Sequence, residues 1–158
     1  MRPIFKFMFS VSLVLFGLNS VIFYAEPKYT YIKEINLPSP LNQRVIKILN
    51  DTDTKSGGLF SRKSLRPVKI VVGELDFWKM AETEILPWKA TVTLNSKENW
   101  DDDFKLETTI LHELGHAYGF WLHDSDPSSI MYYSDSPLIN EDSVNKMLSR
   151  LKRRGHFL

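Results

Sequence analysis

The pattern of hydrophobic and polar positions predicts strands and helices that alternate along the chain. Apolar and polar side chains roughly alternate in residues 29–35 and 89–95, as in strands that have one buried face. Residues 68–75 are mostly apolar and predict a buried strand. Residues 76–88 have no clear period, and we interpret them as a short helix or a long loop.

Helical spacing of apolar residues predicts three further segments. One helix starts at Leu41 and stops at the glycine pair 57–58. A second covers residues 103–118, with an acidic first turn and with Gly119 where a left-handed residue would end it. A third starts near Asn140, which is a favourable N-cap. The buried stripe of this last helix is predicted to consist of Leu138, Val144, Met147, Leu148 and Leu151.

Composition narrows the class of protein. The 158 residues suffice for one domain, and the 43% of hydrophobic residues provide a core, which excludes disorder over most of the chain. The formal net charge is +1 with both signs interspersed, so the sequence predicts no nucleic-acid partner. The chain has no cysteine, which excludes disulfides, thiolate metal ligands and a cysteine nucleophile.

The N-terminal segment 1–25 differs from the rest of the sequence. Basic residues precede an apolar run over residues 7–25, which is typical of an export signal or of an uncleaved membrane anchor. Ala25 suits a cleavage site whereas Phe23 does not, and both alternatives stay open. Either one predicts that the domain formed by residues 26–158 is secreted or membrane-anchored and works outside the cytoplasm.

Candidate chemistry is concentrated in the string His-Glu-Leu-Gly-His. Helical positions four apart share a face, so His112 and His116 can bind one metal ion, and Glu113 lies beside them. Catalytic zinc takes three protein ligands and keeps one open position. Two surface histidines on an amphipathic helix would be the simpler interpretation. Three of the four histidines of the chain, however, fall within residues 112–123 among apolar neighbours.

The chain that follows this string carries a wider resemblance. Gly119 comes three residues after His116, and a further histidine and then Met131 follow. The arrangement resembles the signature of the metzincin zinc peptidases, H-E-x-x-H-x-x-G-x-x-H followed by a Met-turn. The aromatic residue and acidic run before the helix resemble the matrixin branch of that group. The resemblance implies that Gly119 turns the chain, that the next histidine closes the zinc site, and that Met131 lies under the metal.

The spacing after Gly119 departs from the signature by one residue. The signature places two residues between its glycine and its third histidine, whereas this chain has three. Leu122 therefore occupies the expected ligand position, and its side chain cannot bind zinc. His123 is the predicted third ligand and Asp124 is its rival. The spacing from His123 to Met131 matches that of matrixins and favours His123.

Other polar residues near the motif have two interpretations each. Tyr133 is either a phenol that stabilises an oxyanion, as the resemblance to astacins and serralysins implies, or a packed aromatic residue. The acidic run 101–103 could suggest Ca²⁺, which matrixins often carry, but helix capping and the helix dipole explain it without a metal. Glu141 is an alternative third zinc ligand, which Gly119 and the Met-turn disfavour.

Together, the motif and the resemblance predict a zinc-dependent endopeptidase. The implied fold is α+β and metzincin-like: a twisted mixed β-sheet, a zinc-binding active-site helix and a C-terminal helix. Glu113 would be the general base, and the strand 89–95 would border the cleft and pair with an extended protein or peptide substrate. The alternative is a non-catalytic, membrane-tethered zinc-binding interaction domain, which the presence of Glu113 disfavours. Control is expected either to be absent or to come from a protein inhibitor.

Overall fold

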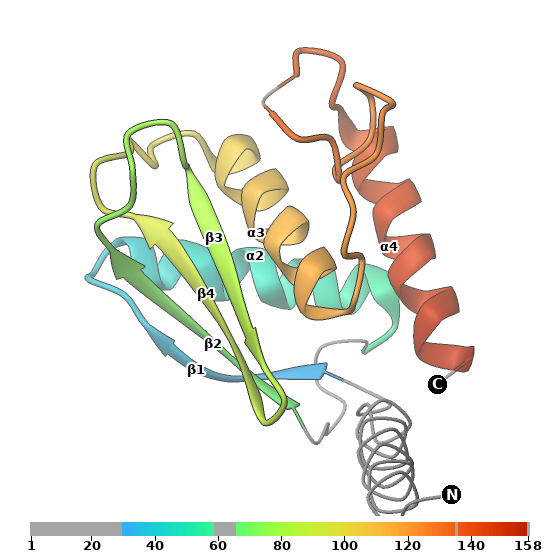
Figure 1. Ribbon diagram of the computed structural model, residues 1–158, viewed down its shortest axis with the longest axis horizontal. Coiled ribbons are helices and arrows are strands. Elements are labelled where there is room, and N and C mark those ends of the chain that lie inside the picture. The colour runs from blue at the N-terminus through green and yellow to red at the C-terminus, as the bar shows by residue number, and fades with distance from the viewer. Residues whose placement is uncertain (1–29, 59–65, 135, 158) are drawn as a thin grey trace, which may run out of the picture.

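The computed structural model describes residues 30–58, 66–134 and 136–157. The predicted export signal or anchor, residues 1–25, lies outside this described part of the chain. Within the described part, no helix combines the length and the apolar character that crossing a membrane requires. The fold is α+β, with a mixed four-stranded sheet and three helices (Figure 1).

The sheet has the strand order β1-β2-β4-β3. Its strands are β1 (Thr30–Asn36), β2 (Arg66–Gly73), β3 (Ala81–Leu86) and β4 (Lys89–Asn95). β1, β2 and β4 are parallel to one another, while β3 forms an antiparallel hairpin with β4. This arrangement confirms the three strands that the hydrophobic pattern predicted.

Two predictions about this region are wrong. The segment 76–88 is neither a short helix nor only a loop, because it contains β3. The strand 89–95 is not at the edge of the sheet, because β4 pairs with β2 on one side and with β3 on the other. The edge strands are β1 and β3, and β3 is the one that packs against α3. A substrate that pairs with the sheet would therefore meet β3, whose outer backbone groups have no partner strand among the described residues.

The three helices are α2 (Leu41–Ser56), α3 (Asp103–Ala117) and α4 (Glu141–Phe157). α2 and α3 cover one face of the sheet, and α4 packs against both helices (Figure 1). Predicted helix ends are confirmed: Gly57 is left-handed with φ of 74°, and the Asn140 side chain accepts hydrogen bonds from the backbone N–H groups of the first turn of α4.

The hydrophobic core lies between the sheet and the helices. The sheet contributes side chains from its two central strands, Val68, Ile70, Ala90, Val92 and Leu94. The predicted stripe of α4 is confirmed for Val144, Met147, Leu148 and Leu151. Leu138 is the exception, because it is 55% exposed. It precedes the N-cap Asn140 and therefore lies outside the helical period.

One buried polar side chain fixes the connection from β4 to α3. Asn95 at the end of β4 is fully buried, and its amide donates hydrogen bonds to the carbonyl oxygens of Asp76 and Lys79. The backbone carbonyl oxygen of Asn95 accepts a hydrogen bond from the indole N–H of Trp100. Because a buried amide left without partners would be costly, these bonds hold the loop before β3 and the start of α3 in a fixed relation.

Candidate metal centre

Three histidine side chains converge at the C-terminal half of α3. His112 and His116 lie one turn apart, with 3.1 Å between their Nε2 atoms. His123 comes from the loop after the helix, and its Nε2 lies 3.2 Å from that of His112. In the described part of the chain, these three residues are the only group of His, Asp or Glu side chains whose ligand atoms are close enough to share a metal ion.

Backbone carbonyls orient two of the three rings. Nδ1 of His112 lies 2.6 Å from the carbonyl oxygen of Ile130, and Nδ1 of His116 lies 2.7 Å from that of Phe120. A carbonyl oxygen only accepts hydrogen bonds, so Nδ1 carries the proton in both rings. In the neutral rings, the lone pairs of Nε2 therefore point into the space between the histidines. Metal-binding histidines are commonly held by such a bond from the other ring nitrogen.

Burial and neighbouring histidines disfavour protonation of the clustered rings. Burial lowers the pKa of His112 to about 4, although its hydrogen bond with Ile130 raises it. Burial and the neighbouring His116 also lower the pKa of His123. Neutral rings leave Nε2 lone pairs facing one another at 3.1 and 3.2 Å, an arrangement that a cation between them would stabilise. Zinc binds imidazole at about 2.0–2.1 Å, which in tetrahedral geometry separates two nitrogens by about 3.3 Å. The donors thus fit Zn²⁺.

The loop after α3 contains the additional residue between Gly119 and His123 and places it at the solvent-exposed side of the loop. Gly119 has φ of 86°, a value that favours glycine, and it turns the chain out of the helix as predicted. Trp121 and Leu122 then project into solvent with 58% and 83% exposure. The chain returns at His123. The additional residue therefore forms part of an exposed bulge and does not carry His123 away from the other two histidines.

The two rival carboxylates are directed elsewhere. Asp124 accepts hydrogen bonds from Arg150 of α4 and from the Ser129 hydroxyl, and the bond from Arg150 is the main reason that the pKa of its carboxyl is lowered. Its backbone N–H donates to the carbonyl of Met131. Glu141 lies at the start of α4 beside a different hollow, described below. Among the candidate third ligands, the fold brings His123 to the pair on α3.

Met131 lies under the helix that carries the first two histidines. Its side chain is fully buried and packs against Gly115, between His112 and His116 in the sequence. A Cβ atom on Gly115 would meet the Met131 sulfur and would come within 2.6 Å of the terminal methyl of Met147. The close approach of these methionines explains why this helical position has no side chain. Sequence reasoning placed Met131 here through the resemblance and assigned no role to Gly115.

Glu113 is held from β3. Its side chain is only 6% exposed, and the Thr83 hydroxyl donates a hydrogen bond to its Oε2 at 2.5 Å. Burial raises the pKa of the Glu113 carboxyl, while the hydrogen bond from Thr83 and the proximity of His116 lower it. Sequence reasoning missed Thr83 because it left β3 unassigned. The alternation in Ala-Glu-Thr-Glu-Ile was the available signal, since it places Thr83 on the inner face.

Two other predicted features have local partners. Tyr133 is 68% exposed and packs against Tyr132 with the rings tilted by 48° and 4.4 Å between their centroids. Its role as an oxyanion stabiliser stays a prediction. In the acidic run, Asp102 caps α3 by accepting from two backbone N–H groups, and Asp103 pairs with Arg44 of α2. These contacts account for two of the three aspartates that suggested calcium.

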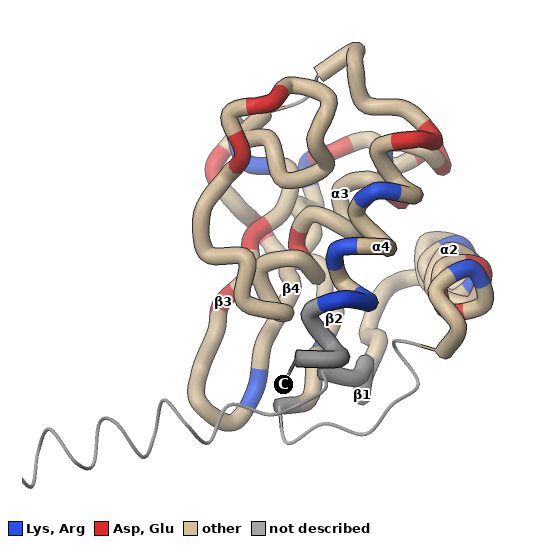
Figure 2. The backbone as a smooth tube through the Cα atoms, turned by 90° about the vertical axis from the view of Figure 1, so that its right-hand side faces the viewer, with Lys and Arg blue, Asp and Glu red and all other residues tan. Residues whose placement is uncertain are grey.

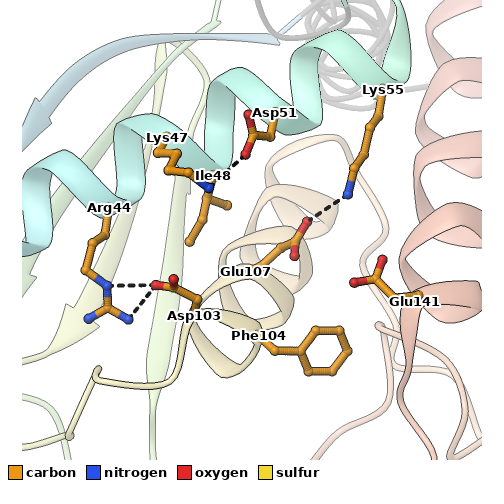
Figure 3. Close-up of a pocket in the computed structure, with 9 residues that line it drawn as sticks. All are labelled: Arg44, Lys47, Ile48, Asp51, Lys55, Asp103, Phe104, Glu107 and Glu141. Carbon is orange, nitrogen blue, oxygen red and sulfur yellow. Dashed lines mark hydrogen bonds and ion pairs between the residues drawn. The ribbon is translucent and has the colours of Figure 1, made fainter.

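A second hollow of about 250 Å³ lies between α2 and the starts of α3 and α4 (Figure 3). Side chains of both charges line it, and Glu107 and Glu141 point toward its centre. Burial raises the pKa of Glu107, although Lys55 at 4.0 Å lowers it. The hollow shares none of its lining residues with the histidine cluster. It therefore belongs to the packing between helices and not to the candidate metal centre.

Comparison of the chain with protein-family models, with curated proteins and with solved structures gives no match.

Proposed function

We propose that this chain is a zinc-dependent endopeptidase of the metzincin type. The observation that carries the proposal is the convergence of three histidine Nε2 atoms next to a buried glutamate on the same helix. His112, His116 and His123 would hold the ion. When bound, Zn²⁺ supplies a Lewis acid that polarises a carbonyl group and makes water more acidic at neutral pH.

Glu113 would serve as the general base. It follows His112 directly, and the hydrogen bond from Thr83 restrains one oxygen of the carboxylate. In the proposed reaction, Glu113 accepts a proton from the attacking water and later delivers it to the leaving amine. Its buried position supports this role, because burial raises the pKa of the carboxyl toward the range in which a group both accepts and releases protons.

The free edge of β3 would position the substrate. An extended peptide can add to this edge through main-chain hydrogen bonds, which replaces the predicted role of β4. β3 packs directly against α3, so a peptide on its outer side lies beside the helix that carries the histidines. Exposure of His123 leaves one side of the cluster open to solvent, as a site that admits a substrate requires. A purely structural zinc site would use that position for a fourth ligand.

Replacing Glu113 tests the proposal. Glu113→Gln keeps the size of the side chain and removes the base, so cleavage of an unfolded protein substrate should fall by about a hundredfold to ten-thousandfold while zinc remains bound. Glu74→Gln in the exposed loop after β2 is the matched control and should retain activity. Zinc content is measured by metal analysis of both variants. Unchanged cleavage by zinc-loaded Glu113→Gln would refute the mechanism, and zinc binding without cleavage by the unmodified chain would favour the interaction domain.

A further inference from the structure

Three strands of the sheet begin at the same end of the molecule. β1, β2 and β4 are parallel, so Thr30, Arg66 and Lys89 start at the same end. The turn between β3 and β4, Pro87 and Trp88, lies at this end as well, because these two residues connect Leu86 to Lys89. The Trp88 side chain is 64% exposed. A large aromatic residue thus projects from the end at which three strands begin.

The same end of the molecule is basic. The C-terminal end of α4 reaches it in both views, and this part of the helix carries the exposed Lys152 and Arg153 (Figures 1 and 2). We call Trp88, Lys89, Lys152 and Arg153 together the basic end. Among the described residues, none of its three cations has an ion-pair partner. They are therefore free to interact with an external anion.

Acidic residues gather at the opposite end. In Figure 2, Asp and Glu (red) lie mainly in the upper part of the tube, while the lower end shows Lys and Arg (blue). The topology explains this separation, because Glu74 and Asp76 follow β2, and Asp101 and Asp102 follow β4, at the ends where these strands finish. Although the formal net charge is only +1, basic and acidic residues are concentrated at opposite ends of the molecule.

In the sequence, the apolar N-terminal segment lies only a few residues before β1. β1 begins at Thr30, and the apolar run of the sequence covers residues 7–25. Four residues, 26–29, lie between them, and four residues span at most about 14 Å even when fully extended. If residues 7–25 stay in a bilayer, the start of β1 must therefore lie near the membrane surface.

We infer that the basic end docks on an anionic membrane surface, with Trp88 at the level of the lipid headgroups. Tryptophan is enriched at membrane–water interfaces because its ring is amphipathic, and lysine and arginine next to an apolar segment are attracted by anionic lipids. The start of β1, the exposed Trp88 and the unpaired cations all lie at one end. The inference concerns orientation and does not depend on the proposed peptidase activity.

The absence of cysteine permits a direct test with the full chain, because a single introduced cysteine is the only labelling site. Pro87→Cys lies in the turn at the basic end, and Asp76→Cys, an equally exposed loop position at the acidic end, is its matched control. Each variant carries the same fluorophore and is reconstituted in vesicles of phosphatidylcholine and phosphatidylserine that contain a headgroup quencher. The label at position 87 should be quenched several times more strongly than the label at position 76.

Charge and aromatic variants complete the test. Lys152→Gln and Arg153→Gln are made in the Pro87→Cys background. Each should lower the equilibrium constant for the docked orientation about fivefold, which is measured as weaker quenching of the label at position 87. Trp88→Ala should lower it as well. Equal quenching at positions 87 and 76 would overturn the inference. So would a preference for position 87 that is unchanged in vesicles of phosphatidylcholine alone, or a mature chain from cells that lacks residues 1–25.

Discussion

The side chain of His123 depends on contacts that local sequence does not encode. Its neighbour Asp124 is bonded to Arg150 of α4 and to Ser129, and the guanidinium of Arg150 lies 4.8 Å from the ring centroid of Phe120. These contacts join the exposed bulge to the last helix. Arg150 and Ser129 therefore help to position His123, although neither belongs to the motif. An arginine or a serine with this role cannot be recognised from a single sequence.

Replacing the third histidine separates the two ligand assignments. His123→Ala should weaken zinc binding by more than about a hundredfold because it removes a ligand, whereas Asp124→Asn should weaken it by about tenfold because it loosens the ligand's support. Zinc titration against a chromophoric chelator measures both affinities.

Deleting Leu122 is the companion variant. The exposed bulge should shorten without loss of zinc, because Leu122 is 83% exposed. If His123→Ala leaves the affinity for zinc unchanged, the assignment of His123 is wrong.

Glu107 provides a pH-dependent prediction away from the histidines. Burial raises the pKa of this carboxyl in the folded state, so the folded chain binds the proton more tightly than the unfolded chain. The free energy of unfolding therefore decreases as pH rises from the unfolded pKa through the raised folded pKa. Glu107→Gln should remove this decrease and should gain stability relative to the unmodified chain between acidic and neutral pH.

Urea denaturation at a series of pH values measures this difference. Glu84→Gln, at an exposed position, serves as the control and should show a difference in stability that is independent of pH. A Glu107→Gln difference that stays constant across the series would contradict the expected role of burial.

At the scale of elements, the sequence identified the helices and strands whose apolar residues are regularly spaced, but it missed β3. The central strands and the three helices have long apolar patterns and recognisable ends at Gly57 and Asn140. β3 has only six residues, of which Ala and Glu are poor strand formers. Its pairing with β4 decides its conformation, and pairing is a long-range property. The error about the sheet edge followed from this omission, since β4 without β3 would have been the last strand.

The packing of α3 on the methionines allows a test at this scale. Gly115→Ala should lower the free energy of unfolding by about 1–3 kcal/mol, because the new methyl group would overlap Met131 and Met147. It should also weaken zinc binding, since His112 and His116 flank the displaced turn. Thermal denaturation and zinc titration measure the two effects.

A double-mutant cycle provides the control. Met147→Ala leaves space next to the added methyl group, so the cost of Gly115→Ala should be smaller in the Met147→Ala background. Strictly additive effects would show that the overlap is not the cause.

At the scale of the whole molecule, the proposed metal would join parts that are distant in the sequence. His112 and His116 belong to α3, whereas His123 is tied through Asp124 to α4. One ion would therefore link the central helix to the C-terminal helix in a chain that has no disulfide. The two helices already share a core, so the ion would add stability to a fold that has its own hydrophobic interior.

Removal of zinc should lower the stability of the whole domain. At a free zinc concentration about a thousandfold above the dissociation constant, binding adds about 4 kcal/mol, which corresponds to roughly 10 °C in Tm. Scanning calorimetry with and without a chelator measures the shift. In His123→Ala the chelator should have a much smaller effect, and an equal effect in both proteins would exclude His123 from the zinc-dependent stability.

The free edge of β3 also has a consequence for the behaviour of the protein in concentrated solution. An unpaired strand edge can pair with the same edge of another molecule, which leads to self-association and aggregation. On β3, Glu82 and Glu84 are both exposed on the outer face, and two such edges brought together would face each other with like charges. Because Glu82 is paired with Lys79, Glu84 contributes most of this repulsion between copies, while the backbone stays accessible to a single uncharged or basic peptide. Resistance to self-association and the proposed binding of substrate would therefore depend on the same six residues.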